Sequence, residues 1–347
     1  MKTEILKLLR KTDGYISGQQ ISDKFGVSRT AVWKVIRQLQ EDGYQVEAVR
    51  NKGYRIVDSP DVITKEELDS RMKTCWAGRN ILYYDVTDST NLRIRQAGDE
   101  GAPHGTLAVA DRQTAGRGRR GRHWESPAGT SIYMSLLLRP ETAPDKASML
   151  TLVMAVSAAE GIREGIAAGR DTEEKSGSTE EDGRQSSPPE IQIKWPNDII
   201  INGKKAAGIL TEMSSQIDYI EHVVIGMGIN VNTVEFPEEI RGTATSLRLE
   251  YGYRIRRAPL IAAVMKRFEE NYKTFLETED LSGLKDRYSA MLVNRDRDVL
   301  IAGPKETYPA HALDISRTGE LIVRREDGTV ERIFSGEVSV RGVYGYV

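Results

Sequence analysis

Cysteine is almost absent from this sequence, since Cys75 is the single one in 347 residues. A lone cysteine cannot form an internal disulfide, and it excludes zinc folds that need several cysteines. Long apolar runs are missing too, because no uncharged stretch reaches the roughly 18–20 residues that cross a bilayer. The opening run MKTEILKLLRKTDG has neither an apolar core segment nor a cleavage site, so we expect no signal peptide. These absences predict a cytoplasmic protein that contacts no membrane.

Charge is unevenly distributed along the chain. The whole sequence has a net charge of −2, but residues 1–60 hold eleven Lys and Arg against seven Asp and Glu. The first sixty residues are therefore at +4, and the remaining 287 residues are at −6. A small basic segment joined to a larger acidic one is typical of a nucleic-acid-binding domain attached to another domain. The charge pattern alone is also consistent with a solvated surface that binds no partner.

The first sixty residues predict a winged helix-turn-helix. Apolar residues three and four apart indicate a helix over 3–10, and Ser17 with Gln20 forms the capping-box pattern that opens a second helix. Ser28 can cap a third helix that runs to about residue 42. The runs QVEAV and YRIV then flank the basic turn RNKG, which predicts a β-hairpin, the wing.

The third helix has the composition of a DNA-recognition helix. Its apolar face packs inward, whereas the opposite face carries cationic and hydroxyl side chains that can reach base edges and phosphates in the major groove. A small helical packing domain is the alternative that the pattern leaves open. The residues expected to contact DNA are Ser28, Arg29, Thr30, Trp33, Lys34 and Arg37 on the helix, with Arg50 and Lys52 on the wing.

From about residue 80 predicted strands and helices alternate, and the first corner between them is a candidate ligand site. The run ILYYDV predicts a strand, and the run DSTN at 88–91 follows it, with Ser89 or Thr90 as the cap of the next helix. Hydroxyl and free N–H groups at such a corner can bind a ligand. The alternative is that these residues only cap the helix and bind no ligand.

An arginine- and glycine-rich segment, GRGRRGR at 116–122, follows the next predicted strand. Its GxGxxG spacing matches a dinucleotide fingerprint, but a second strand follows it instead of the required helix, and no Walker loop is present. Four arginines in seven residues repel one another unless an anion neutralises them, and the glycines let the backbone approach a ligand. The segment therefore suits a mobile clamp over a polyphosphate or an acidic intermediate. A basic surface loop or an RNA-binding tract is the alternative.

Another cation is expected at the end of a later strand. The run IQIK predicts a strand that Pro196 stops, which leaves Lys194 at the strand end, where functional sites are often built. Taken alone, such a lysine is more often structural than catalytic, and the arginine segment in the same domain is what favours a functional role. Asn202-Gly203 then marks a hairpin whose second strand holds Gly208, and a further strand contains GMGIN, where glycines let a ligand approach the backbone.

Two further segments have distinct compositions. Residues 169–190 are acidic, rich in Ser, Gly and Pro, and nearly free of apolar residues, so we expect a disordered insertion there. Residues 293–347 alternate short strands with turn signals at Thr318-Gly319 and Asp327-Gly328, which predicts a small barrel. The barrel carries no catalytic constellation, so we expect it to pack or to dock a partner.

Together these motifs resemble the family of bifunctional biotin–protein ligases and biotin-operon repressors over nearly the whole chain. The motifs that carry the resemblance are DSTN at 88–91, Gln113 with GRGRRGR and Trp124, KWPND at 194–198, Gly208 in AAGIL, and GMGIN at 226–230. The resemblance implies an α+β fold in three parts. They are an N-terminal winged helix-turn-helix at 1–60, a central mixed α/β ligase domain of the class II synthetase-like type at 61–292, and a small SH3-like β-barrel at 293–347.

The activity implied by this resemblance has two steps and a regulatory role. Biotin and ATP give biotinyl-5'-AMP and pyrophosphate, and biotin then passes to a lysine of the biotin carboxyl carrier protein of acetyl-CoA carboxylase. The adenylate also acts as corepressor, because the occupied protein forms a homodimer that binds operator DNA. Mg²⁺ is expected to accompany ATP, and the sequence identifies no ligands for it.

Residue roles also follow from the resemblance. Lys194, Arg117 and Arg119 are implied as catalytic. The residues implied to bind biotin are Ser89, Thr90, Asn91, Gln113, Gly116, Arg117, Gly118, Arg119, Lys194 and Gly208. The residues implied to bind ATP or the adenylate are Arg117, Arg119, Arg122, Trp124, Lys194, Asn197 and Asn230.

Two alternative functions are considered. A lipoate–protein ligase shares the fold and the reaction type, but the winged domain and KWPND argue against it. A biotin-sensing transcriptional regulator without catalysis is the other, and the intact Lys194 with the complete arginine segment argues against it.

Overall fold

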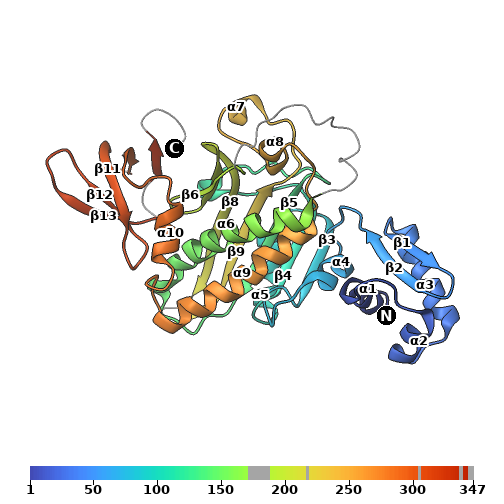
Figure 1. Cartoon of the computed structure of the whole chain (residues 1–347). Helices are drawn as coiled ribbons and strands as arrows, with labels where there is room; N and C mark the ends of the chain where they lie inside the picture. The colour runs from blue at the N-terminus through green and yellow to red at the C-terminus, as the bar shows by residue number, and fades with distance from the viewer. Residues whose placement is uncertain (171–187, 216–218, 304–305, 336–338, 343–347) are drawn as a thin grey trace. The chain divides into compact units, whose positions relative to one another are not determined.

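The computed structural model describes residues 1–170, 188–215, 219–303, 306–335 and 339–342 (Figure 1). The chain divides into two compact units, Met1–Met72 and Lys73–Val347. Most of the expected insertion at 169–190 lies outside the described residues, although Gly169 ends a helix and residues 188–190 precede a strand. Among the helices described, none has the length and apolar character needed to cross a membrane.

The first unit has the predicted helix-turn-helix with a wing, followed by a fourth helix that the sequence analysis did not anticipate. Its elements are α1 (Lys2–Lys11), α2 (Gly18–Phe25), α3 (Arg29–Glu41), β1 (Gln45–Val49), β2 (Gly53–Asp58) and α4 (Lys65–Arg71). The capping box of Ser17 and Gln20 is present, and the Ser28 hydroxyl accepts a hydrogen bond from the Ala31 amide, so both predicted helix starts are confirmed.

The wing is tied to the loop before α2 by a close backbone approach. Ile16 pairs with Tyr54 in an antiparallel bridge. A Cβ on Gly53 would lie 2.1 Å from the Ile16 carbonyl oxygen, and the φ of Gly53 is +111°. Only glycine fits this position, which fixes where the second strand of the wing begins.

The added helix α4 is held to the first unit by one buried carboxylate. Glu67 is fully buried, and its oxygens accept hydrogen bonds from Arg10 at 2.6 Å, Arg71 at 2.5 Å and the Tyr44 hydroxyl at 2.7 Å. Burial and the neighbouring carboxylate raise the pKa of Tyr44, so its hydroxyl remains a donor. A single acidic side chain therefore joins α1, the start of β1 and α4.

The Glu67 cluster predicts a large loss of stability in the first unit on charge removal. Glu67→Gln leaves two partly buried guanidinium groups without their counter-charge, and we expect a destabilisation of roughly 3 kcal/mol. Native-state amide hydrogen exchange on α1 and α3 measures it. The neighbouring Glu66→Gln, on the partly exposed side of α4, should change exchange by no more than about 0.5 kcal/mol. Equal protection in the two variants would contradict the assignment.

The second unit is built on a seven-stranded sheet with the order β3-β4-β5-β9-β8-β7-β6. The strands are β3 (Ile81–Thr87), β4 (Leu107–Gln113), β5 (Ser131–Leu138), β6 (Ile191–Lys194), β7 (Asp198–Ile201), β8 (Lys204–Ser215) and β9 (Ile220–Asn230). Only β3 and β4 run parallel among these neighbours, and all the other pairs are antiparallel. The Asn202-Gly203 hairpin between β7 and β8 is confirmed.

Helices cover the two faces of this sheet differently. Figure 1 shows α6 (Leu150–Gly169) and α9 (Arg257–Thr278) side by side across one face. On that face the hydroxyl of Thr151 in α6 donates a hydrogen bond to the hydroxyl of Thr211 in β8. Because side chains alternate along a strand, Leu210, next to Thr211, points to the opposite face of the sheet. There α5 (Thr90–Asp99) packs through Ile94 on Ala108, Leu137 and Val224, and it leaves the rest of the face open.

The remaining elements connect or follow this sheet. They are η1 (Arg119–Gly121), η2 (Pro144–Met149), α7 (Glu238–Arg241), α8 (Leu247–Tyr251), α10 (Lys285–Met291), β10 (Arg297–Ala302), β11 (Thr307–Ile315), β12 (Leu321–Arg324), β13 (Val330–Ile333) and β14 (Ser339–Gly342). The last five strands form an antiparallel sheet in the order β13-β12-β11-β10-β14, within the same compact unit as the large sheet. The expected all-β C-terminal part of the α+β fold is confirmed.

Candidate functional site

A cavity of about 600 Å³ opens on the part of the large sheet that α5 leaves uncovered. The register of five neighbouring strands places Tyr133, Gly228, Gly208, Asp198 and Lys194 in one row across the sheet. Side chains in such a row share one face, so the two glycines leave a flat floor between a tyrosine at one end and a charged pair at the other. The hairpin and the strand end that carry these residues thus meet at one site.

An indole lies on the glycine floor. A Cβ on Gly228 would lie 2.6 Å from the Trp124 ring, and one on Gly208 would lie 3.1 Å from it. The ammonium of Lys205 lies 5.4 Å from the centre of the same ring. The buried Nε1 of Trp124 has no hydrogen-bond acceptor among the described residues. The site therefore presents a fixed aromatic surface with one unused donor.

The corner at the start of α5 forms a polar wall of the cavity. The amide and the hydroxyl of Thr90 both donate to Gln113 Oε1, at 2.7 and 3.1 Å. Asn91 donates to Glu212 at 2.7 Å, while its Oδ1 lies 2.6 Å from the Ser135 hydroxyl. Ser89 is the N-cap residue of α5, as predicted, although its side chain makes no cap hydrogen bond. These polar groups instead form one network that faces the cavity.

Gly226 is required by this network. A Cβ at that position would lie 2.0 Å from Asn91 Oδ1, well inside van der Waals contact. Register pairs Gly226 with Ser135 on β5, so the missing side chain makes room for the Asn91 amide above that strand pair. The glycines of the GMGIN run therefore admit protein side chains, namely Asn91 at Gly226 and Trp124 at Gly228.

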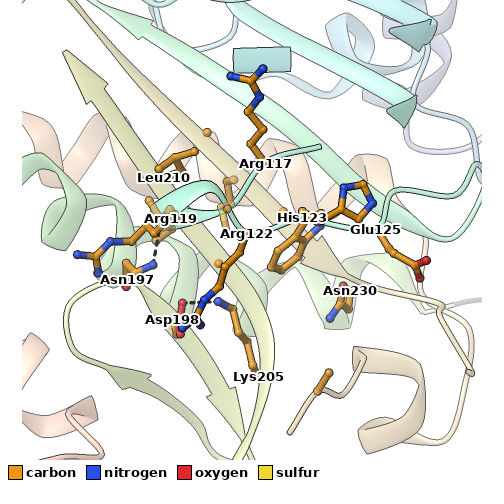
Figure 2. A pocket seen from close by; sticks show the side chains of 18 of the residues that line it. Arg117, Arg119, Arg122, His123, Glu125, Asn197, Asp198, Lys205, Leu210 and Asn230 are labelled. Atoms are coloured by element: carbon orange, nitrogen blue, oxygen red, sulfur yellow. Dashed lines mark hydrogen bonds and ion pairs between the residues drawn. The ribbon is translucent and has the colours of Figure 1, made fainter. Parts of the chain in front are cut away.

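The arginine segment folds over the cavity and is anchored at one residue. Arg119 donates to Asn197 Oδ1 at 2.8 Å and to the carbonyl oxygen of Ser335, beyond β13. Arg120 has a φ of +58°, in the left-handed region, so the chain turns sharply after the anchor. Figure 2 shows Arg117 pointing away from Asp198 and Lys205. Arg119 is thus held by hydrogen bonds to two other parts of the chain, at Asn197 and at Ser335.

Lys194 stands at the charged end of the row with only 5% of its surface exposed. Burial lowers the pKa of its ammonium to about 8, although the nearby Asp198 carboxylate acts in the opposite direction. Lys205, Arg341 and Arg122 add positive charge around it and lower the pKa further. A buried cation surrounded by other cations is suited to a ligand with several negative charges.

The cavity collects nearly all the residues that the sequence indicated for ligand binding. Those that line it are Ser89, Thr90, Asn91, Gln113, Arg117, Gly118, Arg119, Arg122, Trp124, Lys194, Asn197, Gly208 and Asn230. Gly116 is not in the lining, and it packs where a Cβ would lie 2.4 Å from the Trp124 carbonyl oxygen. Its place is behind the indole.

Sequence reasoning missed several lining residues. Asp198 and Lys205 form an ion pair at 2.6 Å, and the hairpin register could have placed both beside Lys194. Val340 and Arg341 of β14 also line the cavity, and no signal in the sequence linked them to it. One of the C-terminal strands, expected to pack or to dock a partner, therefore also contributes a cation to the lining of the cavity.

The residues expected to contact DNA all belong to the first unit. All of them are exposed, namely Ser28, Arg29, Thr30, Trp33, Lys34, Arg37, Arg50 and Lys52. Two cations of the wing, Lys52 and Arg55, lie 5.8 and 5.0 Å from the ring centre of Tyr15. An ordered, cationic and exposed surface of this kind fits a nucleic-acid backbone.

Comparison with known proteins agrees with this division into two units. Residues 83–230 match the biotin/lipoate A/B protein ligase family, and residues 2–55 match a helix-turn-helix domain. The bifunctional ligase/repressor BirA of Bacillus subtilis is 38% identical, with 98% of each chain covered. That of Escherichia coli is 29% identical, with 94% of this chain and 92% of the relative covered.

Solved structures give the same result for the larger part of the chain. The biotin protein ligase of Aquifex aeolicus in complex with biotin and ATP is 31% identical and superposes with a TM-score of 0.63. The match covers 76% of this chain and 99% of that one. The similarity therefore extends over the whole of a ligase that has been seen with both of its small ligands.

The buried ammonium predicts a particular pH dependence of stability. An unfolded lysine keeps a pKa near 10.5, whereas Lys194 in the fold has about 8, so between these values the unfolded chain binds more protons. The buried ammonium therefore destabilises the fold. This destabilisation is fully present below pH 8 and disappears as the pH rises toward 10.5. Lys194→Met removes it, so the stability gained by this substitution should fall by roughly 2–3 kcal/mol between pH 7 and pH 10.

Urea unfolding of wild type and variant at the two pH values measures this difference. Lys204→Met, an exposed lysine on the same hairpin, is the control, and its effect should be the same at both pH values. A Lys194→Met effect that does not depend on pH would show that the ammonium is not destabilised by burial.

Proposed function

The chain belongs to the family of bifunctional biotin–protein ligases and repressors, and from that premise we propose how its residues divide the two activities. It is an ATP-dependent biotin–protein ligase and a DNA-binding repressor. The observation that carries the ligase assignment is the single cavity in which the polar corner, the Trp124 surface and buried Lys194 meet. Biotin and ATP are its substrates in this proposal.

Biotin occupies the end of the cavity near α5. The ring system of biotin has amide-like donors and acceptors on an otherwise apolar body, which suits the network of Thr90, Gln113 and Asn91. The glycines at 226 and 228 let the Asn91 amide and the Trp124 indole lie close to the strands, so biotin is held against these two side chains. This placement directs the carboxylate along the row toward Lys194.

Adenylation brings two anions together, so the chain must neutralise charge and hold geometry. The biotin carboxylate attacks the α-phosphorus of ATP, an anhydride bond forms and pyrophosphate leaves. Lys194 lies between the two reacting groups and stabilises the charge that develops on the phosphate oxygens. Asp198 pairs with Lys205 and keeps that second cation beside the Trp124 ring. Arg122 and Arg341 contribute positive charge near the departing pyrophosphate.

The arginine segment then protects the product. Biotinyl-5'-AMP is a mixed anhydride that water hydrolyses, so a cover over the cavity keeps it for the second step. Arg117 and Gly118 contact the adenylate in this proposal, while Arg119 fixes the segment through Asn197. Trp124 Nε1 supplies a donor to the bound ligand, and Asn230 lies near the phosphates. An acceptor lysine amine attacks the anhydride carbonyl, and AMP leaves.

The acceptor and the metal remain expectations from the family. The acceptor is the biotin carboxyl carrier protein of acetyl-CoA carboxylase. Within the described residues no group of three or more His, Cys, Asp or Glu could hold a metal ion, so we assign no Mg²⁺ ligands. Mg²⁺ is carried in with the triphosphate, whose oxygens it prefers.

Pyrophosphate exchange tests the ligase assignment. Wild type should exchange labelled pyrophosphate into ATP with biotin, and not with lipoate or without an acid. Lys194→Gln removes charge-assisted hydrogen bonds of roughly 1.5–3 kcal/mol each, so exchange should slow ten-fold or more. Lys204→Gln on the same hairpin should exchange at the wild-type rate. Exchange with lipoate would identify the other ligase activity, and no exchange with either acid would leave a regulator without catalysis.

The repressor activity uses the exposed face of the first unit. Arg29, Thr30 and Trp33 enter the major groove from α3, while Arg50 and Lys52 meet phosphates from the wing. One small domain whose first sixty residues have a net charge of +4 binds DNA weakly and mainly through phosphates. A homodimer carries two such domains, and the second gains from the high effective concentration that the first contact creates. Biotinyl-5'-AMP promotes that dimer in this proposal by ordering residues of the arginine segment.

The proposed coupling predicts that biotin with ATP tightens DNA binding ten-fold or more, whereas either ligand alone has little effect. Gel-shift titrations measure it, using duplexes selected by the adenylate-loaded protein from a randomised library. Arg29→Ala should weaken binding in every state, with pyrophosphate exchange followed in parallel to show an intact ligase. Identical midpoints with and without adenylate would refute the coupling.

A further inference from the structure

A large apolar side chain is exposed on α3, among the residues expected to contact DNA. Trp33 is the fifth residue of α3, and 51% of its surface is exposed. Its neighbours Val32, Val35 and Ile36 form the buried stripe of the helix, so the indole takes no part in that core. Exposure of a tryptophan side chain to water is unfavourable, so a partner that covers it gains binding free energy.

The indole is held by a cation on the same face of the helix. The guanidinium of Arg37, one turn further along α3, lies 5.4 Å from the centre of the Trp33 ring. A cation at this distance over a tryptophan face is attracted by the electrons of the ring. The pair is therefore ordered while both side chains remain exposed, and less conformational entropy is lost when DNA covers them.

The chemistry of the indole limits what it can recognise in a major groove. Its only polar group is one N–H donor, so it cannot form the paired hydrogen bonds by which Arg reads guanine or Asn reads adenine. The apolar feature that the groove offers is the C5-methyl group of thymine. Arg29 and Thr30, one turn earlier on the helix, can supply the polar contacts that Trp33 lacks.

We infer that Trp33 is a specificity-determining residue that reads thymine methyl groups, a claim that rests on the operator binding proposed above. Phosphate contacts from Lys34 and the wing give affinity for any sequence, and the indole favours sites with thymine at the positions it covers. The methyl group is what it recognises, so uracil in place of thymine abolishes the preference without changing base pairing.

The test uses the full chain loaded with biotin and ATP and the duplexes that it selects from a randomised library. Each thymine of a selected duplex is replaced singly by deoxyuridine, and binding is measured by fluorescence anisotropy. For wild type we expect about a four-fold loss of affinity at the thymines that Trp33 covers, the value of one buried methyl group. Thymines elsewhere should tolerate the replacement.

Three variants separate this role from general DNA binding. Trp33→Ala should bind thymine and uracil duplexes equally, whereas Trp33→Phe, which keeps an aromatic ring, should retain the difference. Lys34→Ala should weaken binding to all duplexes alike and keep the thymine preference. The slope of its log affinity against log salt concentration should be smaller by about one.

Two results would overturn the inference and leave the repressor function standing. In the first, wild type binds selected duplexes but no single deoxyuridine weakens binding. In the second, Trp33→Ala keeps the wild-type discrimination, so another residue reads the methyl group. A library that yields no bound duplex would instead overturn the DNA-binding role, and the inference with it.

Discussion

The site depends on strand register above all. Tyr133, Gly228, Gly208, Asp198 and Lys194 come from five strands and share one row only because each pair is aligned as it is. A slip of one residue in any pair would turn that strand's contribution to the opposite face of the sheet, toward α6 and α9. The buried, fully packed strand β5 and the tight turn at Asn202-Gly203 make such a slip unfavourable. The chemistry of the cavity is thus a consequence of how the sheet is paired.

Local sequence signals predicted the local structure well. The capping box at Ser17, the cap at Ser28 and the turn at Asn202-Gly203 all formed as expected, because each depends on neighbouring residues alone. Ser89 is the N-cap of α5, as expected, but no side-chain cap hydrogen bond accompanies it. Thr90 bonds instead to Gln113, twenty-three residues away, and a competing long-range partner of this kind leaves no local pattern.

Long-range contributions to the fold and the site could not be predicted from the sequence for the same reason. Arg341 enters the cavity because β14 pairs with β10 at the edge of the second sheet, and nothing in the run SVRG indicates that placement. Helix α4 belongs to the first unit because Glu67 reaches Arg10, fifty-seven residues earlier. Family motifs indicated the candidate ligand-binding residues, whereas the geometry shows which of them touch one another.

Burial is unfavourable for two polar groups of the cavity. The Lys194 ammonium is buried beside the Asp198 carboxylate and several cations, and the N–H of Trp124 Nε1 is buried with no acceptor among the described residues. A buried donor without a partner costs about 1–3 kcal/mol, and a buried charge costs more. In the proposed function an anionic ligand with hydrogen-bond acceptors would offset both costs, because its negative charge would face Lys194 and an acceptor would face the Trp124 N–H.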